Sequence, residues 1–160
     1  MKKMLKEIYP YIIIVVVVVL IRTFIVTPVL VKGQSMFPTL SGNELMILNK
    51  LTKIERYDIV VIDDKEEDHI IKRVYGMPGD RILCEDNTIY INNKAVEDKY
   101  GYGETEDFDQ IKLDEDEYFV LGDNRIVSKD SRLIGPIKEN DVKGTAKLII
   151  FPFNKIGLIN

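Results

Sequence analysis

The sequence predicts a mainly β protein in which an N-terminal transmembrane helix is followed by a β-rich domain. Three observations support this fold class. A long apolar run lies near the N-terminus, short segments with alternating apolar residues follow it, and no helical periodicity of apolar residues appears after the run. At 160 residues the chain suits one stable domain. We expect residues 1–27 to form a cytoplasmic stub and anchor, and residues 28–160 to form the β-rich body.

The apolar run carries a single charge, Arg22, between residues 8 and 31, and residues 11–21 are wholly apolar. Crossing a bilayer takes about 20 residues, so a helix from about residue 5 to residue 26 could span one. Lysines before the run slightly outnumber the basic residues after it, which predicts a cytoplasmic N-terminus and an external body. No A-x-A cut site follows, so an uncleaved anchor is favoured over a removable signal peptide. A buried core helix is the other alternative.

The body shows period-two segments that are bounded by glycine and asparagine, as expected of strands joined by turns. A stretch from 98 to 116 is rich in acidic residues, glycine and tyrosine, and predicts a loop within a small insertion at about 85–116. The result would be a sandwich or barrel-like domain. The expected strands are 45–49, 58–63, 69–75, 81–84, 88–91, 117–121 and 145–151.

Charge and cysteine content exclude several classes of function. The formal net charge of −4 argues against nucleic acid as the main partner. The single cysteine, Cys84, cannot form an internal disulfide or a cysteine-rich zinc site. We therefore expect no metal and no cofactor.

A candidate nucleophile, Ser35, lies in VKGQSMFPTL between the apolar run and the body. The single histidine, His69, belongs to a charged run, so a different base is needed. On the strand that follows His69, Lys72 would share one face with Ile70 and Val74. Burial disfavours the ammonium form and lowers the pKa of a lysine, and a neutral amine can accept a hydroxyl proton. A pKa near 8 instead of about 10.4 corresponds to roughly 3 kcal/mol.

Alternatives remain open for these residues when each is taken alone. Lys72 also fits a surface lysine that protects an edge strand from aggregation. The stretch VLGDNRIVSKDSRLIGPI also fits a solvated turn. It nevertheless places two carboxylates and two arginines within ten residues, which can form bidentate pairs that fix a loop. In the same stretch, Ser128 offers a hydroxyl that could orient the lysine amine.

Four segments, GQSMFPTL, YDIVVI, IIKRVYGMPGDRI and GDNRIVSKDSRLIGPI, follow the apolar run in this order. Together they resemble the conserved boxes of bacterial type I signal peptidases, and the likeness spans nearly the whole chain apart from residues 85–116. The short insertion and single anchor resemble the Gram-positive type. The resemblance implies a membrane-bound serine endopeptidase with a signal-peptidase-like catalytic domain on the outer face of the cytoplasmic membrane. Its partners would be preprotein signal peptides, cut after small residues, with membrane lipid and the secretion machinery nearby.

The resemblance also assigns roles to individual residues. Ser35 would be the nucleophile, Lys72 the general base, and the backbone N–H of Ser35 an oxyanion donor. Some relatives add a hydroxyl two residues before the nucleophile, where this chain has Gly33, so the sequence leaves a second donor undecided. Ser128 would orient the base, two Asp–Arg pairs would brace the site, and two residues would shape the nucleophile turn. These supporting residues are Ser128, Asp130, Arg132, Asp123, Arg73, Met36 and Pro38.

Substrate and membrane contacts follow from the same picture. We expect an extended peptide to lie beside residues 29–34 and 69–72, with main-chain hydrogen bonds contributing affinity. The apolar segments 23–31 and 151–157 are expected to rest on the membrane surface. Two other functions stay open: a sortase-like anchored transpeptidase that uses Cys84 and His69, and a non-catalytic anchored binding module.

Overall fold

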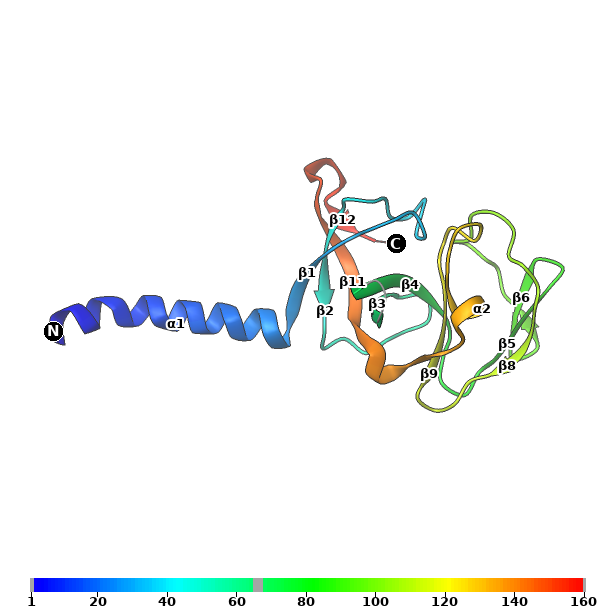
Figure 1. Cartoon of the computed structure of the whole chain (residues 1–160), viewed down its shortest axis with the longest axis horizontal. Coiled ribbons are helices and arrows are strands. Elements are labelled where there is room, and N and C mark those ends of the chain that lie inside the picture. The colour runs from blue at the N-terminus through cyan, green and yellow to red at the C-terminus, as the bar shows by residue number, and fades with distance from the viewer. Residues whose placement is uncertain (1, 65–67, 160) are drawn as a thin grey trace.

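The computed structural model describes residues 2–64 and 68–159. A helix, α1 (Lys2–Phe24), extends from one side of a β-rich body, and a smaller sheet lies at the opposite end (Figure 1). The predicted mainly β class is therefore confirmed for the body. Within the described part of the chain, no helix combines the length and the apolar character that a membrane span requires. The predicted transmembrane helix is thus not confirmed.

The larger sheet runs in the order β1-β2-β11-β3-β4-β9-β10, with β12 beside β11, and all of these pairs are antiparallel. Strand β4 lies between β3 and β9 and pairs with β3 over residues 68–73 and with β9 over residues 73–76. The strands are β1 (Val26–Leu30), β2 (Leu45–Asn49), β3 (Ile59–Asp64), β4 (Asp68–Gly76), β9 (Glu117–Leu121), β10 (Ile137–Lys138), β11 (Val142–Phe151) and β12 (Gly157–Leu158).

The smaller sheet has the order β7-β6-β5-β8 and covers one end of the body (Figure 1). Its strands are β5 (Arg81–Glu85), β6 (Thr88–Ile91), β7 (Lys94–Ala95) and β8 (Phe108–Lys112). Strand β8 corrects the expectation of a loop over residues 98–116. It forms because its backbone pairs with β5 and because Phe108 stacks on Phe119 at a centroid distance of 5.1 Å.

The seven expected strands are all present, as β2, β3, β4, β5, β6, β9 and β11. Strand β1 was not expected, because its residues continue the apolar run. Its five residues pair with the whole of β2, and this pairing ends α1 at Phe24. The remaining short elements are α2 (Ser131–Ile134) and the 3-10 turns at Glu139–Asp141 and Phe153–Lys155.

Strand β4 is buried on both faces. On one face Ile70 and Val74 pack into a core cluster with Val60, whereas on the other face Ile71 joins a separate cluster with Val61. Full burial of each such β-branched side chain contributes about 1.5–3 kcal/mol. The predicted alternation along β4 is therefore confirmed, and the packing fixes the direction in which each of its polar side chains points.

Candidate active site

The predicted nucleophile lies in a turn between β1 and β2. The turn is anchored by Met36 and Leu40, which are buried in a core cluster, and the N–H of Leu40 donates to the carbonyl of Met36 at 2.8 Å. Pro38 lies exposed on the outer side of the same turn, and Ser35 is only partly buried. The turn therefore presents the Ser35 hydroxyl while its neighbours hold the backbone.

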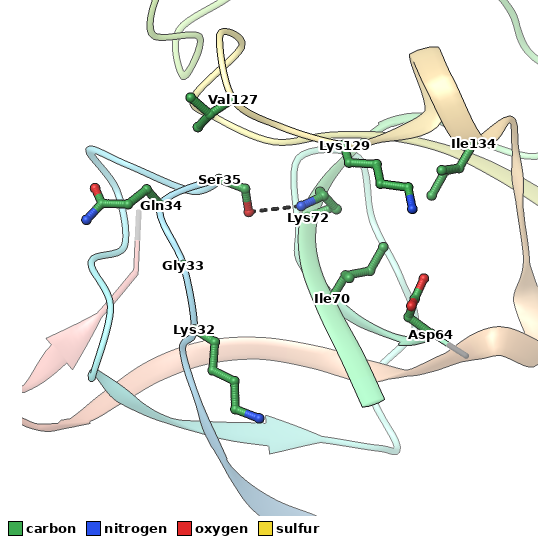
Figure 2. Close-up of a pocket in the computed structure, with 10 residues that line it drawn as sticks. All are labelled: Lys32, Gly33, Gln34, Ser35, Asp64, Ile70, Lys72, Val127, Lys129 and Ile134. Carbon is green, nitrogen blue, oxygen red and sulfur yellow. Dashed lines mark hydrogen bonds between the residues drawn. The ribbon is translucent and has the colours of Figure 1, made fainter. Parts of the chain in front are cut away.

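The predicted base meets this hydroxyl. Lys72 projects from β4, is only 3% exposed, and donates from Nζ to Ser35 Oγ at 2.9 Å (Figure 2). The alternative of a surface lysine on an edge strand is wrong, because β4 is an interior strand and this side chain is buried. Two segments that lie 37 residues apart in sequence are thus joined by one hydrogen bond.

A cavity of about 400 Å³ opens beside this pair (Figure 2). It has charged groups on its walls as well as apolar ones, and the Ser35 hydroxyl and the Lys72 amine point toward each other within it. The lining residues are Lys32, Gly33, Gln34, Ser35, Asp64, Ile70, Lys72, Val127, Lys129 and Ile134.

The loop after β9 holds the backbone of Ser35. The N–H of Asn124 donates to the carbonyl of Ser35 at 2.9 Å. A Cβ placed on Gly122 would lie 2.1 Å from Ser128 Oγ and 2.6 Å from the Ser35 carbonyl oxygen. Only glycine allows this close approach. Gly122 and Asn124 were not predicted as site residues, although both lie in the stretch VLGDNRIVSKDSRLIGPI that the sequence singled out.

Ser128 is buried against Gly122, as expected of a residue near the site. Its Oγ lies close to the Asp130 carboxylate and helps to lower the pKa of that group, but within the described part of the chain it makes no hydrogen bond of good geometry. The predicted contact between this hydroxyl and the amine of Lys72 is therefore not formed in this structure. Orientation of the base by Ser128 stays a prediction.

The first of the expected Asp–Arg pairs joins β4 to the loop after β9. Arg73 donates to Asp123 through Nε at 2.9 Å and through Nη2 at 2.7 Å, and both side chains are almost fully buried. Arg73 also donates to the carbonyl of Tyr57 at 2.9 Å, and its guanidinium lies 3.7 Å from the ring centre of Tyr100. This bidentate pair fixes the loop that contacts Ser35.

The second pair, Asp130–Arg132, joins the start of α2 to the beginning of the same loop. Asp130 caps α2 and accepts from Arg132 at 2.9 and 3.0 Å and from the N–H of Gly122 at 2.9 Å. Burial opposes ionisation of the Asp130 carboxyl, but the hydrogen bonds from Arg132 and Gly122 outweigh it and lower its pKa. The Gly122 backbone is thus held by a charged group.

The lone thiol lies elsewhere. Cys84 is buried in the core of the smaller sheet and does not line the cavity at Ser35. Burial, together with the nearby Asp107 carboxylate, raises the pKa of the Cys84 thiol to about 11. Among the described residues, no group of three or more His, Cys, Asp or Glu side chains is arranged to hold a metal ion.

Comparisons with known proteins show to which family the chain belongs. The profile of the family described as "Signal peptidase, peptidase S26" matches residues 3–151. The chain is 40% identical to signal peptidase I of Bacillus amyloliquefaciens, with 91% of this chain and 86% of that one covered. It is 42% identical to signal peptidase I of Bacillus licheniformis, over 91% and 87% of the two chains.

A solved structure gives the same result. The crystal structure of a signal peptidase I from Enterococcus faecalis V583 is 32% identical, covers 59% of this chain and 97% of that one, and has a TM-score of 0.53. The fold and the comparisons together define a serine peptidase. The chain belongs to the signal peptidase I family, as the sequence boxes indicated. This assignment leaves no support for the sortase-like transpeptidase or for the non-catalytic binding module.

Proposed function

We propose that this protein is a membrane-attached endopeptidase that removes signal peptides from exported preproteins with a Ser35–Lys72 dyad. The hydrogen bond of 2.9 Å between Lys72 Nζ and Ser35 Oγ, at the edge of a cavity of about 400 Å³, is the observation that carries the proposal. A buried amine next to a hydroxyl is the arrangement that serine–lysine catalysis requires.

The reaction follows from these two groups. Ser35 Oγ attacks the carbonyl carbon of the scissile bond, and its proton passes to the neutral amine of Lys72. When the tetrahedral intermediate collapses, the C–N bond breaks and the Lys72 ammonium gives its proton to the leaving amine. Water then attacks the resulting ester, with Lys72 again acting as base, and releases the signal peptide carboxylate and free Ser35.

The oxyanion of the intermediate needs hydrogen-bond donors. Among the described residues, none accepts a hydrogen bond from the backbone N–H of Ser35, which leaves that donor for the substrate. Gly33 has no side chain and so offers no second donor, and its φ of 75° is a conformation that favours glycine at this position. We therefore assign the backbone N–H of Ser35 as a hydrogen-bond donor to the oxyanion. Residue 33 contributes no side-chain donor.

Supporting roles follow from the contacts. We assign the Arg73–Asp123 and Asp130–Arg132 pairs to bracing the loop behind Ser35, and we assign Met36 to anchoring the nucleophile turn. The substrate would lie extended beside residues 29–34 and 69–72, with small side chains entering the cavity near Ile70.

We propose that α1 attaches the protein to the cytoplasmic membrane, with residues 1–27 as anchor and 28–160 as the external catalytic domain. Apolar side chains from Ile8 to Phe24 are exposed on α1, and Phe153 and Leu158 are exposed at the other end of the chain. Such surfaces favour contact with lipid. Alkaline carbonate washing of membrane vesicles tests this assignment, and release of the full chain into the wash would contradict it.

Cleavage of a purified preprotein in detergent tests the catalytic assignment. We expect Ser35→Ala and Lys72→Met each to lose cutting by about 10³-fold or more while the melting temperature stays close to that of wild type. A preprotein with a bulky residue before the cut site should resist the wild-type enzyme. Retained turnover in Lys72→Met would rule out Lys72 as the base.

A further inference from the structure

The loop that contacts Ser35, residues 122–125, ends in a fully buried arginine, Arg125. The side chain of Arg125 has no exposed surface, and its Nη2 donates to Asp98 Oδ2 at 2.6 Å and to the hydroxyl of Tyr75 at 2.8 Å. Its Nη1 donates to the carbonyl of Gly122 and its Nε to Thr105 Oγ1 at 3.2 Å. A guanidinium in such a place keeps its charge, so it requires a carboxylate partner.

The carboxylate partner, Asp98, belongs to a segment that does not line the cavity at Ser35 and Lys72. Residues 98–105, here called the 98–105 segment, run along the loop after β9. The N–H of Tyr102 donates to the carbonyl of Asp123 at 2.7 Å, and the N–H of Arg125 donates to the carbonyl of Tyr102 at 3.0 Å. A Cβ on Gly101 would lie 2.3 Å from Asp98 Oδ2, so the segment folds tightly around this carboxylate.

Two contacts connect this arrangement to the nucleophile turn. The N–H of Asn124, next to Arg125, holds the Ser35 carbonyl at 2.9 Å. The rings of Phe37 and Tyr102 meet edge to face at a centroid distance of 5.4 Å. The loop that fixes Ser35 is therefore held by Arg125 from behind, while the 98–105 segment lies against it.

We infer that Asp98 is a positioning residue for the reaction, and that it acts on Ser35 through Arg125 and the loop of residues 122–125. The inference rests on the proposed function. The Asp98 carboxylate neutralises the buried Arg125 guanidinium and fixes its orientation. In that orientation the guanidinium donates to the Gly122 carbonyl and holds it in place. The backbone that follows carries the N–H that holds Ser35. An error of about 1 Å in the position of a nucleophile lowers turnover strongly without affecting substrate binding.

The test measures kcat and KM for cutting of a purified preprotein in detergent. Asp98→Asn keeps the shape of the side chain but removes its charge, so we expect kcat to fall on the order of tenfold while KM changes less than about twofold. Asp98→Glu should recover part of kcat. The matched control is Glu97→Gln, because Glu97 is its exposed neighbour and should leave kcat unchanged.

A core variant separates positioning from loss of stability. Ile89→Val removes one buried methyl group from the core of the smaller sheet and serves as a stability control. The inference is overturned if Asp98→Asn keeps the wild-type kcat. It is also overturned if Ile89→Val, compared at the same fraction of folded enzyme, loses as much kcat as Asp98→Asn. If Asp98→Asn does not fold, Tyr75→Phe takes its place. A kcat loss of about threefold at constant KM then supports the inference, and an unchanged kcat overturns it.

Ser35→Ala keeps the two proposals apart. If Ser35→Ala cuts at the wild-type rate, the dyad is wrong whatever Asp98→Asn does. If Ser35→Ala is inactive and Asp98→Asn retains full kcat, only the positioning inference fails.

Discussion

The two faces of β4 carry two buried basic side chains with different surroundings. On one face Lys72 donates to the Ser35 hydroxyl at 2.9 Å between Ile70 and Val74. On the other face Arg73 forms a bidentate pair with Asp123 and stacks on Tyr100. Neighbours in sequence, the two residues face opposite sides because strand side chains alternate.

The difference between the faces shows how one strand can supply both a reactive group and a brace. A guanidinium stays charged in a protein. Arg73 Nη2 lies 2.7 Å from Asp123 Oδ2, so its charge stabilises the fold through this ion pair. A lysine amine can lose its proton, and burial favours the neutral form that a base requires. Exchanging the two side-chain types should therefore damage different properties of the enzyme.

The largest effect is expected from Lys72→Arg. A guanidinium cannot accept the Ser35 proton, so preprotein cutting should fall by about 10³-fold or more even though the positive charge is kept. Initial rates of cleavage measure this loss. Lys147→Arg is the matched control, because Lys147 pairs with Asp58 on the surface and should behave like wild type. Substantial activity in Lys72→Arg would mean that the amine is not the base.

Asp123→Asn should show its main effect on stability. The change leaves the Arg73 charge buried without its carboxylate, which costs about 3–5 kcal/mol in the free energy of unfolding. Urea unfolding followed by circular dichroism measures the difference. The exposed Glu97→Gln variant should unfold like wild type. A loss below 1 kcal/mol for Asp123→Asn would show that the pair does not brace this face.

Gly122→Ala tests the loop that connects the two faces. The added methyl group would meet the Ser128 side chain and the Ser35 carbonyl, so the nucleophile should shift and cutting should fall by about 10²-fold. Gly157→Ala is the control, because a Cβ there meets no atom within 4 Å and should leave the rate unchanged. Equal rates for the two variants would place Ser35 outside the influence of this loop.

Asp130→Asn should give the smallest change, about 2 kcal/mol at neutral pH, because charged hydrogen bonds to Arg132 and Gly122 are weakened. The folded-state pKa of Asp130 is lowered, so its stabilisation is present above the ordinary carboxyl pKa and is lost as pH falls through the folded value. The difference in urea midpoint between wild type and variant should therefore shrink below about pH 4. A difference that grows on acidification would contradict this sign.

Most of the strands could be predicted from the sequence because they are short runs of apolar residues, continuous in β3 and β9 and alternating in burial in β2 and β6, and several end at or just before a glycine or an asparagine. Strand β8 could not, because FDQIK is largely exposed and becomes a strand only by pairing with β5. Strand β1 was hidden by the apolar run that it continues.

The candidate site shows a similar division. Ser35 and Lys72 were found because their segments resemble known boxes and because burial of Lys72 follows from the alternation in β4. Asp98 gave no local signal, since it lies in an acidic stretch and meets Arg125 only through the fold. The predicted contact of Ser128 with the base depends on side-chain orientation, which sequence does not determine.

The pH dependence of a single turnover tests most directly whether a neutral Lys72 amine removes the Ser35 proton. Cutting of a preprotein by excess enzyme should speed up with pH, by about tenfold per unit where the amine is mostly protonated, and then level off. Lys72→Met should show only a small residual rate at every pH. A wild-type rate that stays constant from pH 6 to pH 10, or a Lys72→Met rate equal to it, would contradict the role of Lys72.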